Sequence, residues 1–166
     1  MNFAMHFLVW RRRSLRPYLD DPETRAYGVL VLGFVVLVVL GLVVAGAASP
    51  LPALRMAVFQ VASVITSTGF STADYSVWPQ HLPLLMAILA YIGGCAGSTA
   101  GGLKVVRVLL LAKIGVRQFV TISHSRAITL VKLGQRRVPE EILYSVWAYY
   151  SLYILTALVL TVAMMA

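Results

Sequence analysis

The fold is decided by residues 53–70, which read ALRMAVFQVASVITSTGF. The first part of this stretch, residues 53–65, is apolar apart from Arg55, Gln60 and Ser63. As a helix it would be about 20 Å long, which is too short to cross a hydrocarbon core of about 30 Å. That length is typical of a re-entrant segment, which enters a membrane and leaves on the same side. The polar residues that follow it would then begin their return at membrane depth.

The composition of the chain is that of a membrane protein. Of its 166 residues, 60% are apolar and only 12% are charged, and the mean hydropathy is +0.84. Soluble domains are about half apolar and about a quarter charged. The formal net charge of +8 would suggest nucleic acid in a soluble protein, but here the basic residues lie in blocks between apolar runs. We therefore expect membrane lipid, and no nucleic acid, around this chain.

Three further apolar runs are long enough to cross a membrane, because each would form a helix of about 33 Å or more. They predict an outer helix over residues 27–48, an inner helix over 82–112 that continues past Lys104, and another helix over 142–166. With a pore helix over 53–65 between the first two, the sequence predicts an all-α membrane protein built around a helix–re-entrant loop–helix unit.

The basic residues give this unit an orientation. Residues 1–26 and the linker 113–141 are rich in Lys and Arg, whereas residues 49–81 contain only Arg55 and Asp74 as charged residues of the Lys, Arg, Asp and Glu types. Cytoplasmic loops of membrane proteins carry an excess of Lys and Arg. We therefore expect 1–26 and 113–141 in the cytoplasm and 49–81 on the external side.

The polar run after the short helix is a candidate ion site. It comprises Thr66, Ser67, Thr68, Gly69 and Phe70. The glycine can adopt a positive φ at little cost, and backbone carbonyls of such a loop can replace the hydration shell of a monovalent cation. The C-terminal end of the preceding helix would add negative potential. Such a loop could hold a dehydrated potassium ion at residues 66–69 without a formal charge. The alternative is an external turn, with residues 53–65 lying flat on the membrane interface.

A run of glycines interrupts the predicted inner helix. It comprises Gly93, Gly94, Cys95, Ala96, Gly97, Ser98, Thr99, Ala100, Gly101 and Gly102. Glycine weakens a helix by about 1 kcal/mol relative to alanine, so these residues favour an unwound, pore-facing segment. The alternative is close helix packing through Gly93, Gly97 and Gly101, which are spaced by four residues. A phosphate-binding loop is excluded, because Lys104 is followed by Val105 and not by Ser or Thr.

The sequence gives no sign of an enzyme. The apolar runs contain no paired carboxylates and no Ser-His-Asp grouping, and His6, His81 and His124 lie in different segments. The single cysteine, Cys95, is best explained as a small packing residue. We therefore expect no enzymatic activity, no catalytic residue and no covalently bound cofactor.

Residues 92–107, which read IGGCAGSTAGGLKVVR, resemble the hallmark of the Trk/Ktr/HKT potassium transporters, and are closest to the bacterial Trk branch. Supporting stretches are Asn2–His6 with Asp21–Glu23, and Thr68–Thr72 followed by Trp78-Pro79. The resemblance covers essentially the whole chain. It implies four helix–pore loop–helix repeats around one ion path. This chain would hold the tail of the second repeat (1–26), the whole third repeat (27–112), a linker and the first helix of the fourth (142–166), so we expect it to be a fragment.

The same resemblance implies roles for the residues described above. Residues 66–70 would form one filter segment of four, residues 93–102 the gating loop, and Lys104 and Arg107 the cytoplasmic mouth. It further implies a bacterial inner-membrane location with 49–81 in the periplasm, a homodimer, and a cytosolic nucleotide-binding regulatory subunit (TrkA-like). The competing interpretation is a non-transporting membrane scaffold or assembly subunit, in which the glycines serve only helix packing.

Overall fold

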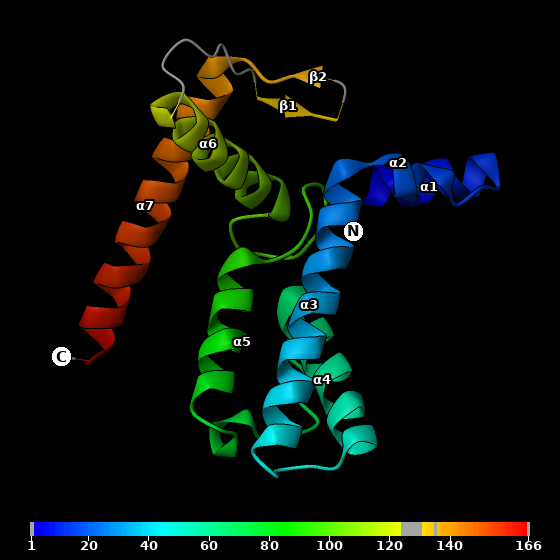
Figure 1. The fold of residues 1–166 in the computed structure, drawn as a ribbon, viewed down its shortest axis with the longest axis vertical. Coiled ribbons are helices and arrows are strands. Elements are labelled where there is room, and N and C mark those ends of the chain that lie inside the picture. Colours follow the sequence, from blue (N-terminus) through cyan, green and yellow to red (C-terminus); the bar gives the residue numbers. More distant parts are fainter. Residues whose placement is uncertain (1, 124–130, 135, 166) are drawn as a thin grey trace. The chain divides into compact units, whose positions relative to one another are not determined.

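The computed structural model describes residues 2–123, 131–134 and 136–165, and the chain divides into two compact units, Met1–Val105 and Val106–Ala166 (Figure 1). The first unit contains α1 (Phe3–Arg12), α2 (Arg16–Asp20), α3 (Pro22–Val44), α4 (Pro50–Ile65), a 3-10 turn (Tyr75–Val77) and α5 (His81–Ile92). The second contains nearly all of α6 (Val105–Ser123), the strands β1 (Lys132–Leu133) and β2 (Arg136–Arg137), and α7 (Glu140–Met165). The predicted all-helical fold class is confirmed, since the strands form only a two-residue antiparallel ladder.

Helix α3 begins five residues before the position predicted from hydropathy. Asp21 caps the helix by accepting a hydrogen bond from the backbone N–H of Thr24 at 2.8 Å, and Pro22 occupies the first helical position, where a missing N–H costs nothing. The helix ends at Val44, before the predicted Ala48, because the chain turns at Gly46 with a φ of +68°. Helix α3 is long and apolar enough to cross a membrane, as is α7.

Helix α4 runs back alongside α3 and forms the core of the first unit (Figure 1). It begins at Pro50 and not at Ala53, because proline is tolerated in the first turn of a helix. One stripe of α4 is fully buried, with a residue at every fourth position: Ala53, Ala57, Val61 and Ile65. Small residues on such a stripe let two helix backbones approach closely. Helix α4 therefore packs closely against its neighbours along this stripe.

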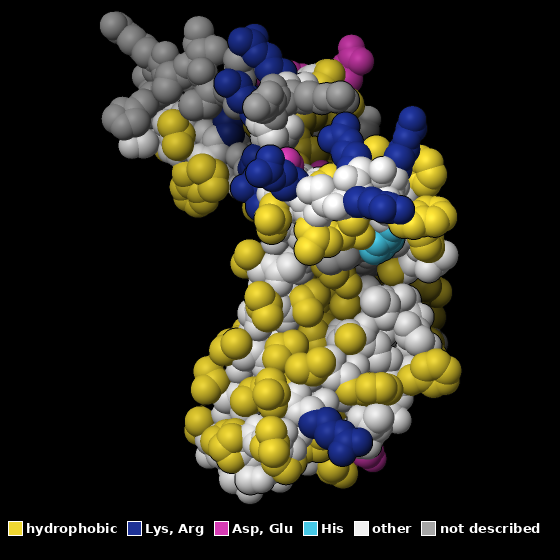
Figure 2. Space-filling view, turned by 90° about the vertical axis from the view of Figure 1, so that its right-hand side faces the viewer, with side chains coloured by type: hydrophobic (Ala, Val, Ile, Leu, Met, Phe, Trp, Pro, Cys, Tyr) yellow, Lys and Arg dark blue, Asp and Glu magenta, His cyan; other side chains and the backbone are white. Residues whose placement is uncertain are grey.

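Helix α5 completes this core. Leu82, Met86 and Leu89 lie on one face of α5 and pack into the same buried cluster as Val38 and Leu42 of α3. The opposite surfaces of these helices are apolar too: Figure 2 shows hydrophobic side chains spread over the outer face of the first unit. An apolar core covered by an apolar surface suits a protein surrounded by lipid.

The second unit corrects two predicted boundaries. Helix α6 continues to Ser123 and so takes up the first eleven residues of the predicted linker 113–141, and α7 begins at Glu140 before the predicted Ile142. Glu140 accepts a hydrogen bond from the guanidinium of Arg117 at 2.8 Å, which joins α6 to the start of α7. Residues 124–130 and 135 of the predicted linker, with Met1 and Ala166 of the terminal segments, lie outside the described residues.

Candidate functional site

The turn after α4 is built by hydrogen bonds at the end of the helix. Thr66 caps α4, and the next two backbone N–H groups fold back onto the last turn: Ser67 donates to the carbonyl of Val64 at 3.0 Å, and Thr68 to that of Ser63 at 2.9 Å. This pair of bonds is the Schellman arrangement, which usually requires glycine at the position held here by Ser67. Ser67 accordingly has a φ of +56°, and Gly69 follows with a φ of +79°.

Two buried polar side chains of α4 hold the returning chain against the helix. The hydroxyl of Ser63 donates to the carbonyl of Phe70 at 2.6 Å, and the amide of Gln60, which is 1% exposed, donates to the carbonyl of Ala73 at 2.7 Å and to the hydroxyl of Ser71 at 2.8 Å. Earlier residues of the helix thus pair with later residues of the loop. The chain therefore runs back along α4 towards the end at which α4 began.

The carbonyls between these two sets of bonds accept no hydrogen bond within the described part of the chain: those of Thr66, Ser67, Thr68 and Gly69. The hydroxyls of Thr66 and Thr68 bond to each other at 2.7 Å, and Thr66 also donates to the carbonyl of Ala62 at 2.6 Å. All five residues from Thr66 to Phe70 are exposed. The segment is therefore an exposed run of four successive backbone carbonyls that have no hydrogen-bond donor among the described residues.

The glycine-rich run is a folded loop between two helices. Helix α5 ends at Ile92 and α6 begins at Val105, so a continuous glycine-packed helix, the alternative interpretation, is wrong. The two ends of the loop bond to each other: Leu103 and Lys104 donate from their backbone N–H groups to the carbonyls of Tyr91 and Ile92, both at 2.9 Å. We refer to residues 93–104 as the intramembrane loop, after the position that the sequence predicts for them.

Two glycines make the crossing of the loop's ends possible. Gly93 and Gly102 have φ values of +69° and +86°, and their backbones touch. A Cβ atom added at Gly93 would lie 2.0 Å from the carbonyl oxygen of Gly101, and one added at Gly102 would lie 2.9 Å from the Cα of Gly93. Only glycine fits these two positions, because both have a positive φ and neither has room for a Cβ atom.

The intramembrane loop directly contacts residues 66–70, which we refer to as the filter segment after their predicted role. The backbone N–H of Gly101 donates to the hydroxyl of Ser67 at 3.1 Å. On its other side the loop meets residues that precede α3 or begin it: the N–H of Ala96 donates to a carboxylate oxygen of Glu23 at 2.6 Å, and the N–H of Phe3 donates to the carbonyl of Gly97 at 3.3 Å. The structure thus brings together the two regions that the sequence singled out separately.

The two basic residues assigned to the cytoplasmic mouth lie in different surroundings. The ammonium of Lys104 folds back onto the loop and donates to the carbonyls of Ser98, at 3.3 Å, and Ala100. Arg107, in the second unit, lies with its guanidinium carbon 4.1 Å from the centre of the Tyr149 ring, in a cation–π contact. Their role at a cytoplasmic mouth stays a prediction. Cys95 is buried in the loop with 1% exposure.

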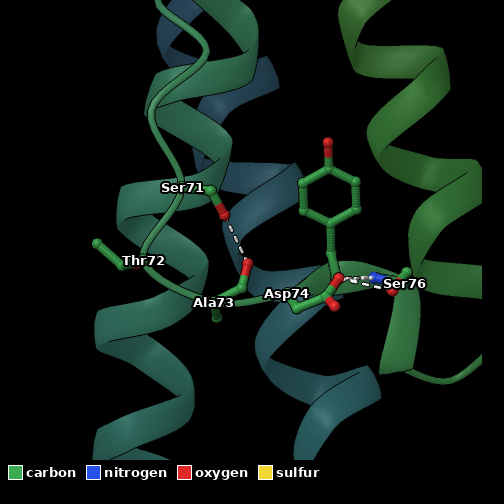
Figure 3. Close-up of a pocket in the computed structure, with 6 residues that line it drawn as sticks. Ser71, Thr72, Ala73, Asp74 and Ser76 are labelled. Carbon is green, nitrogen blue, oxygen red and sulfur yellow. Dashed lines mark hydrogen bonds between the residues drawn. The ribbon is translucent and has the colours of Figure 1, made fainter.

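Beyond the filter segment, residues 71–76 form an open hollow around the only acidic residue between positions 49 and 81 (Figure 3). Asp74 accepts hydrogen bonds from the hydroxyl and the backbone N–H of Ser76, at 2.6 and 2.9 Å. These bonds lower the pKa of the Asp74 carboxyl, so that it stays charged. The Ser71 hydroxyl closes the other side of the hollow by donating to the Ala73 carbonyl at 2.6 Å.

The donor-free carbonyls of residues 66–69 can attract a cation. Within the described residues, no group of three or more His, Cys, Asp or Glu side chains is placed to hold a metal ion.

Two of the contacts that define the site were not predicted from the sequence, those of Ser67 and Glu23 with the loop. A signal for the second was present, because an acidic residue at the edge of an apolar run needs a partner.

The chain is similar to known cation transporters along almost its whole length. The family model of TrkH, described as a cation transport protein, matches residues 3–166. The Trk system potassium uptake protein TrkH of Halomonas elongata is 40% identical over 165 residues, which cover 99% of this chain and 34% of that protein. The protein of the same name from Salmonella typhimurium is 45% identical over 166 residues, which again cover 99% of this chain and 34% of that protein.

A solved structure has the same fold. The crystal structure of the potassium transporter TrkH from Vibrio parahaemolyticus matches with a TM-score of 0.90 at 36% identity, over 96% of this chain and 35% of that one. The present chain therefore spans about a third of the length of the relatives that it matches.

Proposed function

The chain belongs to the TrkH family of cation transport proteins, and from that premise we propose that it forms part of a potassium uptake transporter. The relatives that it matches are named as Trk system potassium uptake proteins, and they are transporters, not enzymes. In this proposal residues 66–70 supply one filter segment of four, and potassium is the transported ion. The scaffold alternative is not favoured by these relatives.

The observation that carries the proposal is the row of carbonyls from Thr66 to Gly69. In the hydrocarbon region of a membrane a backbone carbonyl has no water to pair with, so a row of exposed carbonyls without donors at that depth would need another positively polarised partner. A dehydrated potassium ion is such a partner, and the C-terminal end of α4 adds negative potential at the same place. Three equivalent segments, expected elsewhere in the transporter, would complete the coordination shell.

We further propose that the intramembrane loop obstructs the ion path below the filter, with residues 93–102 acting as its gate. Lys104 and Arg107 would lie towards the cytoplasmic mouth. In the bacterial inner membrane, residues 1–26 and 113–141 would face the cytoplasm, and 49–81 the periplasm, as the distribution of basic residues indicates. The whole transporter would be a homodimer, with a cytosolic nucleotide-binding subunit (TrkA-like) acting on it.

The direct test is a chimera in which the matched third of the Salmonella typhimurium relative is replaced by residues 1–166. It is expressed in cells that lack their own potassium uptake systems, and growth on limiting potassium and rubidium tracer uptake are measured. We expect growth and uptake above those of cells carrying no transporter. A chimera that is inserted in the membrane at the level of the unmodified relative, but takes up no tracer, would refute the proposal.

A second measurement separates the filter from an ordinary external turn. After Cys95 is replaced by alanine, single cysteines are introduced as Thr68→Cys and, for comparison, Val77→Cys, where the native valine is 78% exposed. A membrane-impermeant thiol reagent is added outside, with and without potassium. We expect rapid labelling at position 77 and slow labelling at position 68 that potassium slows further. Equal labelling at the two positions would support the scaffold interpretation.

A further inference from the structure

We propose that Glu23 is a latch for the intramembrane loop, a positioning residue whose carboxylate holds the loop against the start of α3 and keeps the ion path obstructed. The inference rests on the proposed function, since it takes the loop as the gate of a potassium path. It adds to that function the side chain that keeps the gate in place.

The carboxylate of Glu23 is committed to the loop and is not needed to cap its own helix. Asp21 already caps α3, because it accepts from both the backbone N–H and the hydroxyl of Thr24, at 2.8 and 2.7 Å. Glu23 is only 9% exposed, and it reaches the N–H of Ala96 at 2.6 Å, across 73 residues of sequence. Hydrogen bonds to a charged acceptor are shorter and roughly twice as strong as those between neutral groups.

A second contact holds the neighbouring residue of the loop from the same side. The N–H of Phe3 donates to the carbonyl of Gly97, next to Ala96, at 3.3 Å. The side chain of Asn2 lies so close that a Cβ atom added at Gly97 would be 2.9 Å from its Oδ1. Residue 96 is therefore attached to the first turn of α3, and residue 97 to a part of the chain that precedes this helix.

The shape of the loop, by contrast, is maintained from within. Lys104 donates to the carbonyls of Ser98 and Ala100, and the crossed backbones at Gly93 and Gly102 hold the two ends together. Releasing Glu23 would therefore leave the folded loop intact while removing its strongest attachment to α3. What changes is the position of the loop, and a loop that leaves its position opens the path.

The test compares substitutions at Glu23 in the chimera described above. Glu23→Ala removes the acceptor, Glu23→Asp keeps the charge but withdraws it from Ala96, and Glu23→Gln keeps an accepting oxygen in place. The matched control is Glu141→Ala, because Glu141 is also the second residue of a long apolar helix but is exposed. Two readouts are measured: basal potassium flux in proteoliposomes without any regulatory subunit, and labelling of Cys95 by a permeant maleimide in a chimera without other cysteines.

We expect Glu23→Ala and Glu23→Asp to raise both basal flux and Cys95 labelling by on the order of 10- to 100-fold, the factor that a hydrogen bond to a charged group is worth. Glu23→Gln should stay closer to the unsubstituted chimera, and Glu141→Ala should equal it. A gain of flux is informative because a loss of folded transporter lowers the flux that the transporter carries. If Glu23→Ala does not accumulate in the membrane, the comparison of Glu23→Asp with Glu23→Gln tests the inference instead. Flux and Cys95 labelling should then be higher in Glu23→Asp than in Glu23→Gln.

Two results would overturn the inference: no rise of either readout in a Glu23→Asp protein that accumulates normally, or an equal rise in Glu141→Ala. The failure of the proposed function looks different. In that case the unsubstituted chimera takes up no potassium, whereas Cys95 labelling still reports whether Glu23 holds the loop.

Discussion

The filter segment 66–70 and the intramembrane loop touch each other, yet they are held in different ways. The filter segment is held by the helix that immediately precedes it, through Ser63 and Gln60 of α4, at sequence separations of 7 to 13 residues. The loop is attached through Ser67 and Glu23, at separations of 34 and 73 residues.

This difference indicates which of the two regions is able to move. A segment fixed by its own helix moves only if that helix moves, and one face of α4 is packed against α3 and α5 from Ala53 to Ile65. A loop with a rigid shape and a few distant attachments changes position when one attachment is lost. We therefore expect a fixed filter and a movable loop, and the predictions below test this contrast.

The largest effect is expected from Gly93→Ala, which would destroy the shape of the loop. The new Cβ would lie 2.0 Å from the Gly101 carbonyl oxygen, at a φ of +69°. The conformational cost of about 1–2 kcal/mol and the overpacking cost of about 1–3 kcal/mol together destabilise the protein by about 2–5 kcal/mol. Thermal unfolding of the purified chimera in detergent measures this.

The control for that variant is Gly46→Ala. Gly46 has a similar φ of +68°, but nothing lies within 4 Å of its Cβ position, so only the conformational cost of about 1–2 kcal/mol applies. Equal destabilisation by the two variants would show that the close approach of Gly93 to Gly101 and Gly102 adds nothing to the free energy of unfolding.

A smaller effect is expected from Gln60→Leu, which removes a brace of the filter segment. The change removes the two hydrogen bonds that Gln60 donates to Ser71 and Ala73, which still bond to each other, so it should cost about 0.5–1.5 kcal/mol for each bond lost. Selectivity for potassium over sodium should fall, while Cys95 labelling stays unchanged, because the loop is attached elsewhere. The same change at the exposed Gln118 of α6 is the control and should alter neither property.

Ser67 joins the two regions, and two substitutions there separate its two roles. Ser67→Ala removes the acceptor for Gly101 and should destabilise by about 0.5–1.5 kcal/mol. Ser67→Gly removes it too, but relieves a side chain from a φ of +56°, so its stability should be close to the parent. Both should increase Cys95 labelling modestly. If neither variant changes Cys95 labelling, the hydrogen bond between Ser67 and Gly101 does not help to hold the loop in position.

The smallest effect is expected at Asp74, outside both regions. Because Ser76 lowers the pKa of Asp74, this carboxylate contributes stability above the range where carboxyls ordinarily titrate, and the contribution is lost as the pH falls through the lowered pKa. Ser76→Ala should move the pKa of Asp74 back towards its ordinary value, as carbon-13 NMR titration would detect. Selectivity and Cys95 labelling at neutral pH should not change.

What the sequence could predict follows the same division between local and distant contacts. The lengths of the apolar runs predicted where α3, α4, α5 and α7 lie to within a few residues, because helix length and apolarity are local properties. The glycine run likewise indicated a break in the inner helix, because each glycine lowers the stability of a helix at its own position, whatever the rest of the fold.

The contacts of the loop were beyond such reasoning. Glu23 reads locally as an acidic residue favoured at a helix start, and only the folded chain brings Ala96 to it. Lys104 reads as a cytoplasmic anchor, yet its ammonium binds carbonyls of the loop itself. Gly69 was expected to make the turn, but the αL position that ends α4 is held by Ser67, a residue that rarely adopts it.

The central claim, that the carbonyls of Thr66 to Gly69 line a potassium path, is tested most directly by the potassium-over-sodium selectivity of the chimera carrying Gly69→Ser. The matched variant is Gly46→Ser, since both glycines have a positive φ and open space around the Cβ position. We predict a loss of selectivity for Gly69→Ser and parental selectivity for Gly46→Ser. Unchanged selectivity in a Gly69→Ser protein that still takes up potassium would contradict the claim.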